Sequence, residues 1–220
     1  MTPTWKRRIS LVPQPSAPIP DDFEITGRFY VDKHGFKLRD FLNIKRRKSE
    51  VKTPDLMVVM MNPGSSRPMD GKDNCLEEVP AKPDSTQYQI IRLMNQCRFN
   101  YARILNLSDL REPKSTIFYG MITELDQRNL NKHSIFSKER TKDFDTLFVK
   151  GIPVVCAWGV DEKLSHLAAM AMERIAARNI LGKKKEVPYP AYYHPLPRKR
   201  TDRENWLVAI SEQISSSWVK

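Results

Sequence analysis

The segment Leu56-Met-Val-Val-Met-Met-Asn62-Pro63-Gly64 is an apolar run that stops abruptly at a polar residue. A run without polar alternation is typical of a strand whose two faces are both covered by helices. Because proline restricts the preceding residue to extended geometry, we expect Asn62 to project from the end of this strand. The segment Ala191-Tyr-Tyr-His194-Pro195 gives His194 the same position. Open α/β sheets bind ligands at the carboxyl ends of their strands, so the two segments predict one shared site.

Apolar runs and helical periods alternate along the chain around these two segments. The pattern predicts an α/β fold, a three-layer sandwich in which helices cover both faces of a central four-stranded, mostly parallel sheet. The expected strands are residues 55–61, 101–108, 152–159 and 187–193, and the expected helices are residues 87–97, 114–125, 137–149, 161–181 and 202–218. Glycine often follows the last residue of a helix, so Gly182 is expected to end the fourth of these helices.

The N-terminal part of the chain has a different composition. Residues 1–22 contain five prolines and a basic triplet at residues 6–8, which predicts an extended arm. Two runs that flank Asp32-Lys-His-Gly35 predict an N-terminal β-hairpin beside the main sheet. A basic loop at residues 45–52 is expected to lead into the first core strand. Residues 23–220 are therefore expected to form a single α/β domain.

The charge balance favours a polyanionic partner. Lysine and arginine number 37 against 26 aspartates and glutamates, which gives a net charge of +11. Nucleic acid, and DNA first, is the partner that such an excess indicates. The alternative is a basic protein whose charges are only solvated.

Cysteine content and hydropathy exclude other classes of protein. Cys75, Cys97 and Cys156 lack any CxxC spacing, so neither a disulfide framework nor a four-cysteine iron–sulfur cluster is expected. No stretch approaches 18 consecutive apolar residues, so no membrane span is expected. We therefore expect a cytoplasmic monomer that uses neither a metal ion nor another cofactor.

Four short motifs at strand ends resemble those of the uracil-DNA glycosylase superfamily. Met61-Asn62-Pro63-Gly64 is similar to the first signature motif of its single-strand-selective branch, and His194-Pro195 is similar to the second. Leu105-Asn106 and Trp158-Gly159 fall between them in the order of the superfamily core. The resemblance covers roughly residues 55–215 and is closest to an uncharacterised bacterial branch. It implies a monofunctional DNA glycosylase that flips out a pyrimidine, excises it and leaves an abasic site.

The resemblance also implies roles for three of these residues. Cleavage of an N-glycosidic bond develops negative charge on the departing base and positive charge on the sugar. The base therefore needs a hydrogen-bond donor, and the sugar needs a water molecule held close to it. His194 would donate to the base oxygen and Asn62 would hold the water molecule. Asn106 would bind the Watson–Crick edge of the extruded base. Each also has a structural explanation, because Asn62 could cap a turn, Asn106 could satisfy the backbone and His194 could be a hydrogen-bonded core residue.

The residues after each motif depart from the superfamily pattern. Gly64, Ser65 and Ser66 would border the base. The two serines stand where relatives carry bulky side chains, so the pocket is expected to be wider than uracil requires. Leu196 could wedge into the base stack, and phosphate contacts are expected from Arg67 and from the triplet Arg198, Lys199 and Arg200.

A wide pocket changes the expected substrate. Uracil, or a bulky modified cytosine such as the glucosylated hydroxymethylcytosine of phage DNA, would be excised, in DNA repair or in antiphage defence. The loop at residues 64–86 could instead fold back through Met69, Leu76 or Tyr88 and close the pocket to uracil size. Two other functions stay open, a non-catalytic nucleic-acid-binding protein with this fold and a hydrolase of free nucleosides.

Overall fold

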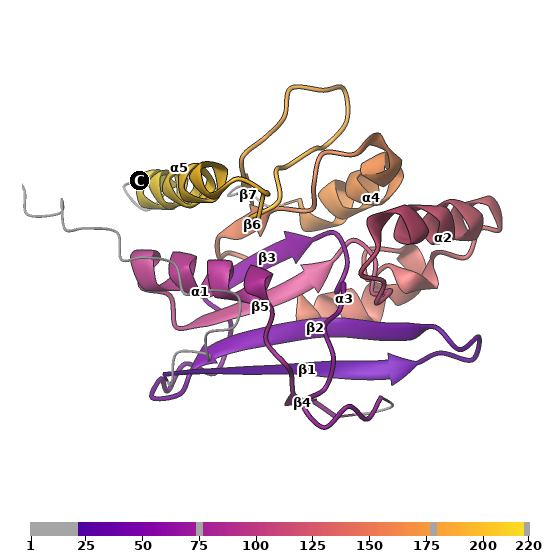
Figure 1. Cartoon of the computed structure of the whole chain (residues 1–220), viewed down its shortest axis with the longest axis horizontal. Coiled ribbons are helices and arrows are strands. Elements are labelled where there is room, and N and C mark those ends of the chain that lie inside the picture. The colour runs from indigo at the N-terminus through magenta and orange to yellow at the C-terminus, as the bar shows by residue number, and fades with distance from the viewer. Residues whose placement is uncertain (1–21, 74–76, 177–179, 218–220) are drawn as a thin grey trace, which may run out of the picture.

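The computed structural model describes residues 22–73, 77–176 and 180–217. The predicted arm, apart from Asp22, lies outside these residues. One mixed sheet of seven strands forms the middle layer of the described part, in the order β4-β1-β2-β5-β3-β6-β7 (Figure 1). The strands are β1 (Phe23–Val31), β2 (Lys37–Arg46), β3 (Leu56–Met60), β4 (Val79–Pro80), β5 (Tyr101–Asn106), β6 (Val154–Cys156) and β7 (Ile180–Leu181).

Helices cover both faces of this sheet, as predicted for a three-layer α/β fold (Figure 1). The α-helices are α1 (Ser85–Cys97), α2 (Ser115–Gln127), α3 (Thr141–Leu147), α4 (Ser165–Ile175) and α5 (Arg200–Ser217), and short 3-10 helices are η1 (Asn131–His133), η2 (Lys138–Arg140) and η3 (Glu162–Leu164). Strand β3 alternates between the layers, because Val58 packs with α1 and α5 whereas Met57 and Val59 pack with α2, α3 and α4. The unbroken apolar run of β3 follows from this burial on both faces.

The parallel part of the sheet places the ends of the core strands at one edge. Strand β3 lies between β5 and β6 and is parallel to both, and β7 is parallel to β6. In the register of β3 with β5, Met60 is the partner of Asn106. The residues that follow β3 and those that end β5 are therefore neighbours at the carboxyl edge.

The predicted four-stranded sheet is wrong in size, because the hairpin belongs to the sheet. Strand β2 pairs antiparallel with β5 over residues 42–45, so β1 and β2 extend the sheet rather than lie beside it. Strand β4 then pairs with β1 at Gly27. Strand β2 also continues to Arg46, so the predicted basic loop at 45–52 begins two residues later.

The fourth parallel strand and the helix before it also differ from the prediction. Helix α4 ends at Ile175, with Ala176 as a left-handed cap, and the fourth strand is β7 rather than residues 187–193. Pro188 and Pro190 lack the N–H groups that a ladder needs, so the latter segment makes only isolated bridges.

Gly182 was predicted to end a helix, but it follows β7 instead. A Cβ atom there would lie 2.5 Å from the ring of Tyr192 and 2.6 Å from the carbonyl oxygen of Cys156. The residue is glycine because the ring of Tyr192 and the backbone carbonyl of Cys156 leave no room for a Cβ atom.

Two local predictions are confirmed. The turn at Asp32–Gly35 joins β1 to β2, and Asp84 caps α1 in a capping box with Gln87. The cap sets the first turn of α1 beside the residues described next.

Candidate functional site

Asn62 lies just beyond β3, at the carboxyl edge, and its side chain has a defined orientation. Its Nδ2 donates to the carbonyl oxygens of Leu110 at 3.3 Å and Glu112 at 2.7 Å. Because both partners are acceptors, the amide must present its nitrogen to them. The Oδ1 atom is left to accept a hydrogen bond from a water molecule or a ligand.

Asn106 ends β5 and is fully buried, and its partner is a side chain rather than the backbone. Its Oδ1 accepts from Nη2 of Arg39 at 2.8 Å. Arg39 comes from β2, is 3% exposed, and takes part in none of the ion pairs formed within the described residues. Burial lowers the pKa of Arg39 to about 10, against the opposing effect of the Asp84 and Asp109 carboxylates. The guanidinium therefore remains a buried cation at neutral pH.

Four of the buried polar atoms that have no hydrogen-bond partner among the described residues belong to β2, to the end of β5, to the first turn of α1 and to the loop after Asn62. They are Nε of Arg39, Nδ2 of Asn106, Nε2 of Gln87 and Oγ of Ser66. The first three are donors, and the serine hydroxyl can donate or accept. Buried polar groups are nearly always paired in native proteins, so a group of unpaired donors indicates a place where a ligand supplies acceptors.

His194 emerges from a segment that is fixed on both sides. Tyr192 exchanges backbone hydrogen bonds with Gly159, and Nε1 of Trp206 donates to the carbonyl oxygen of Tyr193. The backbone N–H of Leu196 donates to Nδ1 of His194 at 3.1 Å. In the neutral ring the proton therefore resides on Nε2, which makes Nε2 a donor.

Asp84, the cap of α1, connects these groups electrostatically. Burial lowers the pKa of His194 below its ordinary value, and the Asp84 carboxylate opposes this shift. The same carboxylate acts on Arg39. His194, Arg39 and Asn106 thus belong to one neighbourhood at the start of α1, at the edge where Asn62 also lies.

The loop after Asn62 docks against the edge of the sheet. Gly64 has a positive φ of 59°, and Ser66 is buried while Ser65 and Arg67 are exposed. Nε of Arg111 donates to the carbonyl oxygen of Ser66 at 2.6 Å. Of the three residues predicted to border the base, only Ser66 is buried, whereas Gly64 is half-buried and Ser65 is exposed.

The alternative prediction was that this loop folds back through Met69, Leu76 or Tyr88, and the three residues differ in position. The side chain of Met69 is 58% exposed, so it covers nothing. Tyr88 is buried in the first turn of α1, and Leu76 lies outside the described residues. The loop is held by the bridge between Pro68 and Ala81 and by the pairing of β4 with β1.

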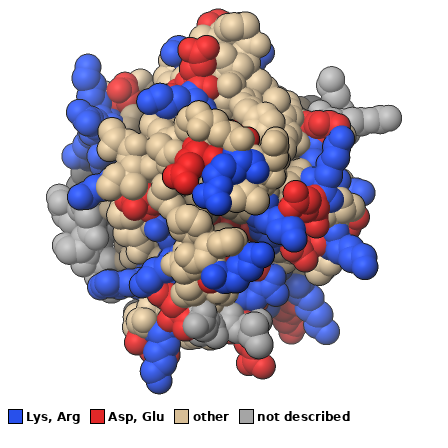
Figure 2. Space-filling view, turned by 90° about the vertical axis from the view of Figure 1, so that its right-hand side faces the viewer, with Lys and Arg blue, Asp and Glu red and all other residues tan. Residues whose placement is uncertain are grey.

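The predicted DNA-contacting residues are on the surface. Leu196 is half-buried, whereas Arg198, Lys199 and Arg200 are exposed at the start of α5. The carboxyl edge as a whole is not uniformly basic. Figure 2 shows the face toward which β3 and β5 point in Figure 1, with acidic side chains interspersed among the lysines and arginines.

Sequence reasoning missed Arg39 and Gln87. The sequence does contain a signal for Arg39, because Arg39-Asp40 interrupts the apolar residues of a predicted strand. The structure shows that both residues are buried. Gln87 falls within a predicted helix, and nothing in the surrounding sequence indicates that its Nε2 atom lacks a partner.

The described residues contain no helix that is long and apolar enough to cross a membrane. Within the same residues no group of three histidine, cysteine or acidic side chains could hold a metal ion. Neither finding bears on what the site binds.

Comparisons with known proteins give one family match. Residues 44–196 match the model of a family described as "Protein of unknown function (DUF1643)". No curated protein matches the chain. Among solved structures, a mutant of the feruloyl esterase module from Clostridium thermocellum, complexed with sinapinate, is similar at a TM-score of 0.36 and 10% identity, over 99% of this chain and 71% of that one. A likeness this weak carries no argument about activity.

Proposed function

The chain belongs to the DUF1643 family, and we propose that it is a DNA glycosylase that binds an extruded pyrimidine at the Arg39–Asn106 pair and hydrolyses its N-glycosidic bond. No comparison assigns this activity. The proposal rests on the geometry of the site together with the resemblance of its motifs.

The buried cation carries the proposal. Arg39 is charged, 3% exposed and without an ion pair in the described part of the chain, which is a costly state for a protein interior. A departing pyrimidine base is an anion. A fixed positive charge in a dry site stabilises an anion that develops during the reaction, and this stabilisation appears mainly in the transition state.

His194 supplies the second donor to the leaving base. Its Nδ1 accepts from Leu196, so its Nε2–H is free to donate to a base oxygen. Since burial lowers its pKa, the ring is neutral at pH 7 and donates without first releasing a proton.

Asn62 orients the attacking water molecule. With Nδ2 held by Leu110 and Glu112, its Oδ1 accepts from the water and directs the oxygen lone pair toward the sugar. An amide is too weak a base to remove a proton, so water attacks a sugar that already carries positive charge. The C1′–O bond forms as the bond to the base breaks, and the proton that the added water loses passes through solvent to the anionic base.

The unpaired atoms favour a base with many acceptors. Uracil offers two carbonyl oxygens as acceptors, whereas the three buried donors and the serine hydroxyl can bind more than two acceptor atoms. A cytosine with a hydroxylated 5-substituent meets this requirement better, so we propose it ahead of uracil. All four side chains are at most 3% exposed, so a base must open the segments around them to enter.

The test is base release from defined oligonucleotides. Single- and double-stranded DNA carrying uracil, thymine, hydroxymethylcytosine or its glucosylated form is incubated with the protein, and abasic sites are then cleaved with alkali. Strand scission at a modified base is expected, and it is expected to disappear with His194→Ala. His166→Ala, an exposed histidine on α4, is the control that retains activity.

Other outcomes separate the alternatives. Binding to the oligonucleotides without scission at any base would indicate a non-catalytic DNA-binding protein. Release of base from free nucleosides, but not from DNA, would indicate a nucleoside hydrolase. Robust uracil release without scission of the glucosylated DNA would remove the wide-pocket proposal and leave the reaction class intact.

A further inference from the structure

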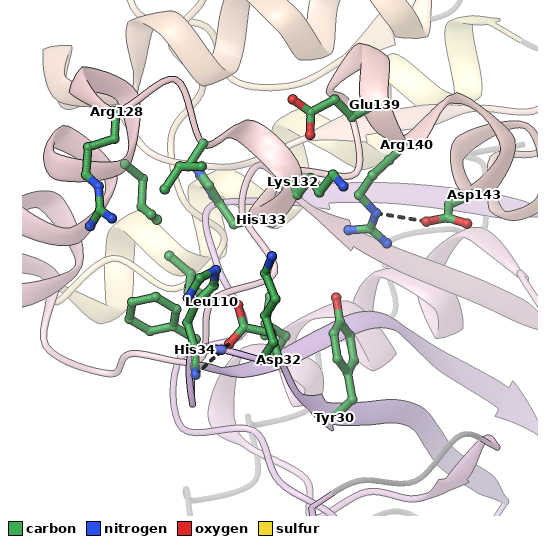
Figure 3. Close-up of a pocket in the computed structure, with 15 residues that line it drawn as sticks. Tyr30, Asp32, His34, Leu110, Arg128, Lys132, His133, Glu139, Arg140 and Asp143 are labelled. Carbon is green, nitrogen blue, oxygen red and sulfur yellow. Dashed lines mark hydrogen bonds and ion pairs between the residues drawn. The ribbon is translucent and has the colours of Figure 1, made fainter.

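A cavity of about 1100 Å³ lies between the β1–β2 turn, α2, η1 and η2 (Figure 3). It borders the candidate site at Leu110, whose side chain lines the cavity and whose carbonyl oxygen accepts from Asn62. It is lined by none of the residues predicted to act on DNA. Phe36 and the buried side chains of Leu38, Leu110 and Leu125 give it an apolar floor. The cavity therefore offers a surface for a flat or aliphatic body of small-molecule size.

His133 places an unpaired donor in the wall of this cavity. The ring is 6% exposed and Nδ1 lies 2.9 Å from Oγ of Ser108. That oxygen already accepts from the backbone N–H of Leu110 at 3.3 Å, so its own hydrogen is available to Nδ1. The imidazole proton is then on Nε2, which has no partner among the described residues.

The charge state of His133 is fixed by its surroundings. Burial lowers its pKa to about 4, with Arg140 and His166 acting in the same direction. At neutral pH the ring is therefore a neutral N–H donor, which requires an acceptor atom rather than a counter-ion.

The rim of the cavity carries positive charge that is not used inside the protein. Arg140 pairs with Asp40, Asp109 and Asp143, and Arg128 pairs with Glu124. Lys33 and Lys132 are exposed and take part in no ion pair of the described chain. Three acidic residues also line the cavity: Asp143 pairs with Arg140, the Asp32 carboxylate accepts from the backbone N–H groups of His34 and Phe36, and Glu139 is the third. Figure 3 shows His133, Lys132 and His34 around the same space.

We propose that this cavity binds a small organic anion with a ring system, separately from the DNA substrate. The ring lies on the leucine floor, an acceptor atom takes the Nε2–H of His133, and the acidic group is held by Lys33 and Lys132. An aromatic carboxylate and a nucleoside monophosphate share this chemistry, and the experiment separates them.

The first measurement uses 1-anilinonaphthalene-8-sulfonate, a fluorescent aromatic anion, titrated into the folded protein at pH 7.5. Saturable binding of one molecule per chain is expected. Reversal of the rim charge with Lys33→Glu and Lys132→Glu is expected to weaken it at least tenfold.

The control is a second double variant with the same change in net charge. Lys142→Glu and Lys150→Glu alter exposed lysines outside the cavity lining and are expected to leave the affinity unchanged. No saturable binding, or equal weakening by both double variants, would overturn the proposal.

Competition then identifies the class of ligand. Displacement of the probe by adenosine monophosphate indicates a nucleotide site, and displacement by phenylacetate alone indicates an aromatic carboxylate site. Displacement by neither overturns the assignment.

Imidazole nitrogen spectra test the role of His133 without a mutation. The Nε2 resonance of His133 is expected to shift when the displacing ligand is added, and to stay in place when sodium chloride is added at the same concentration. An unshifted Nε2 would remove His133 from the site.

Discussion

Arg39 and Asn106 share a hydrogen bond in the interior, yet each keeps an unpaired donor. A pair maintained for stability would be satisfied on all sides, because an unpaired buried polar group costs about 1–3 kcal/mol. A pair maintained for ligand binding bears this cost in the empty protein. The two explanations predict opposite effects of removing both side chains.

The double change Arg39→Met and Asn106→Leu removes both partners and keeps an apolar volume. We expect the free energy of unfolding in urea to stay constant or rise, because replacing both partners by apolar groups is nearly neutral or stabilising. Base release should fall by about 10²–10³-fold, the cost of one such donor. A destabilisation above about 2 kcal/mol would show that the pair is structural.

Arg103→Met is the control for this double change. Arg103 also comes from β5, but its three nitrogens donate to Asn43, to the Leu147 carbonyl and to Tyr101 at 2.9–3.0 Å. Its removal leaves those acceptors unpaired, so the free energy of unfolding should fall.

His133 gives the protein a dependence on pH that can be given a sign. Its folded pKa of about 4 lies below the ordinary value of 6.5, so the unfolded chain binds the proton more tightly. The stability from keeping the ring neutral is complete above pH 6.5 and is lost as the pH falls toward 4. At 1.36 kcal/mol per pKa unit the loss is about 3 kcal/mol.

Urea denaturation at pH 7.5 and pH 4 measures how much free energy of unfolding each protein loses between the two pH values, and the contribution of His133 is the difference between the wild type and a variant without it. The wild-type chain should lose about 3 kcal/mol more than His133→Gln, because glutamine does not titrate. Equal losses in wild type and His133→Gln would contradict the low pKa.

Among the parallel strands, β7 is the one that sequence reasoning misplaced, and Gly182 explains why. An isolated glycine after a helical period reads as a helix end. The actual reason for glycine is the approach of Tyr192 and Cys156, which are distant in sequence. Periodicity and capping chemistry are local, and they predict the bounds of α1, β3 and β5 to within about two residues. A packing constraint between distant segments leaves no local pattern in the sequence.

Gly182→Ala tests that constraint. The added Cβ would lie 2.6 Å from the Cys156 carbonyl oxygen, and the glycine φ of 155° disfavours a side chain. We expect the free energy of unfolding in urea to fall by about 1–3 kcal/mol, as for other overpacked sites. The control is Gly120→Ala in α2, where an added Cβ would have no atom of another part of the fold within 4 Å. Alanine there should raise the free energy of unfolding by about 0.5–1 kcal/mol. The same sign at both positions would refute the packing argument.

At the scale of the whole molecule, the strand series placed the candidate site better than it described its contents. Asn62 and Asn106 follow neighbouring parallel strands, as the apolar runs predicted. The partner of Asn106 comes from β2, because the hairpin joins the sheet instead of lying beside it. Sequence separation hid that pairing, since Arg39 precedes Asn106 by 67 residues.

Under the proposed function, some of the basic residues behind the net charge of +11 must contact DNA, and Figure 2 shows mixed charges on the carboxyl edge. Arg198, Lys199 and Arg200 are exposed, lie four to six residues after His194, and enter none of the ion pairs of the described residues. Arg203 donates to the carbonyl oxygens of Pro197 and Arg198, which fixes the start of the triplet. Phosphate contacts beside His194 would therefore be made by a positioned segment.

Changing all three residues of the triplet to glutamine should weaken DNA binding to the same degree for every sequence. The slope of log K against log salt should decrease in magnitude by about 0.9 per lost contact on duplex DNA and about 0.7 on single strands. Stability should not suffer, because a positive charge at the start of α5 is unfavourable to the helix dipole. Glutamine at Lys138, Lys142 and Lys150 removes the same charge from exposed positions on the α3 side and serves as the control. If both triple variants lower the slope equally, the triplet acts only through net charge, and the groove that guides DNA to His194 must be built from other residues.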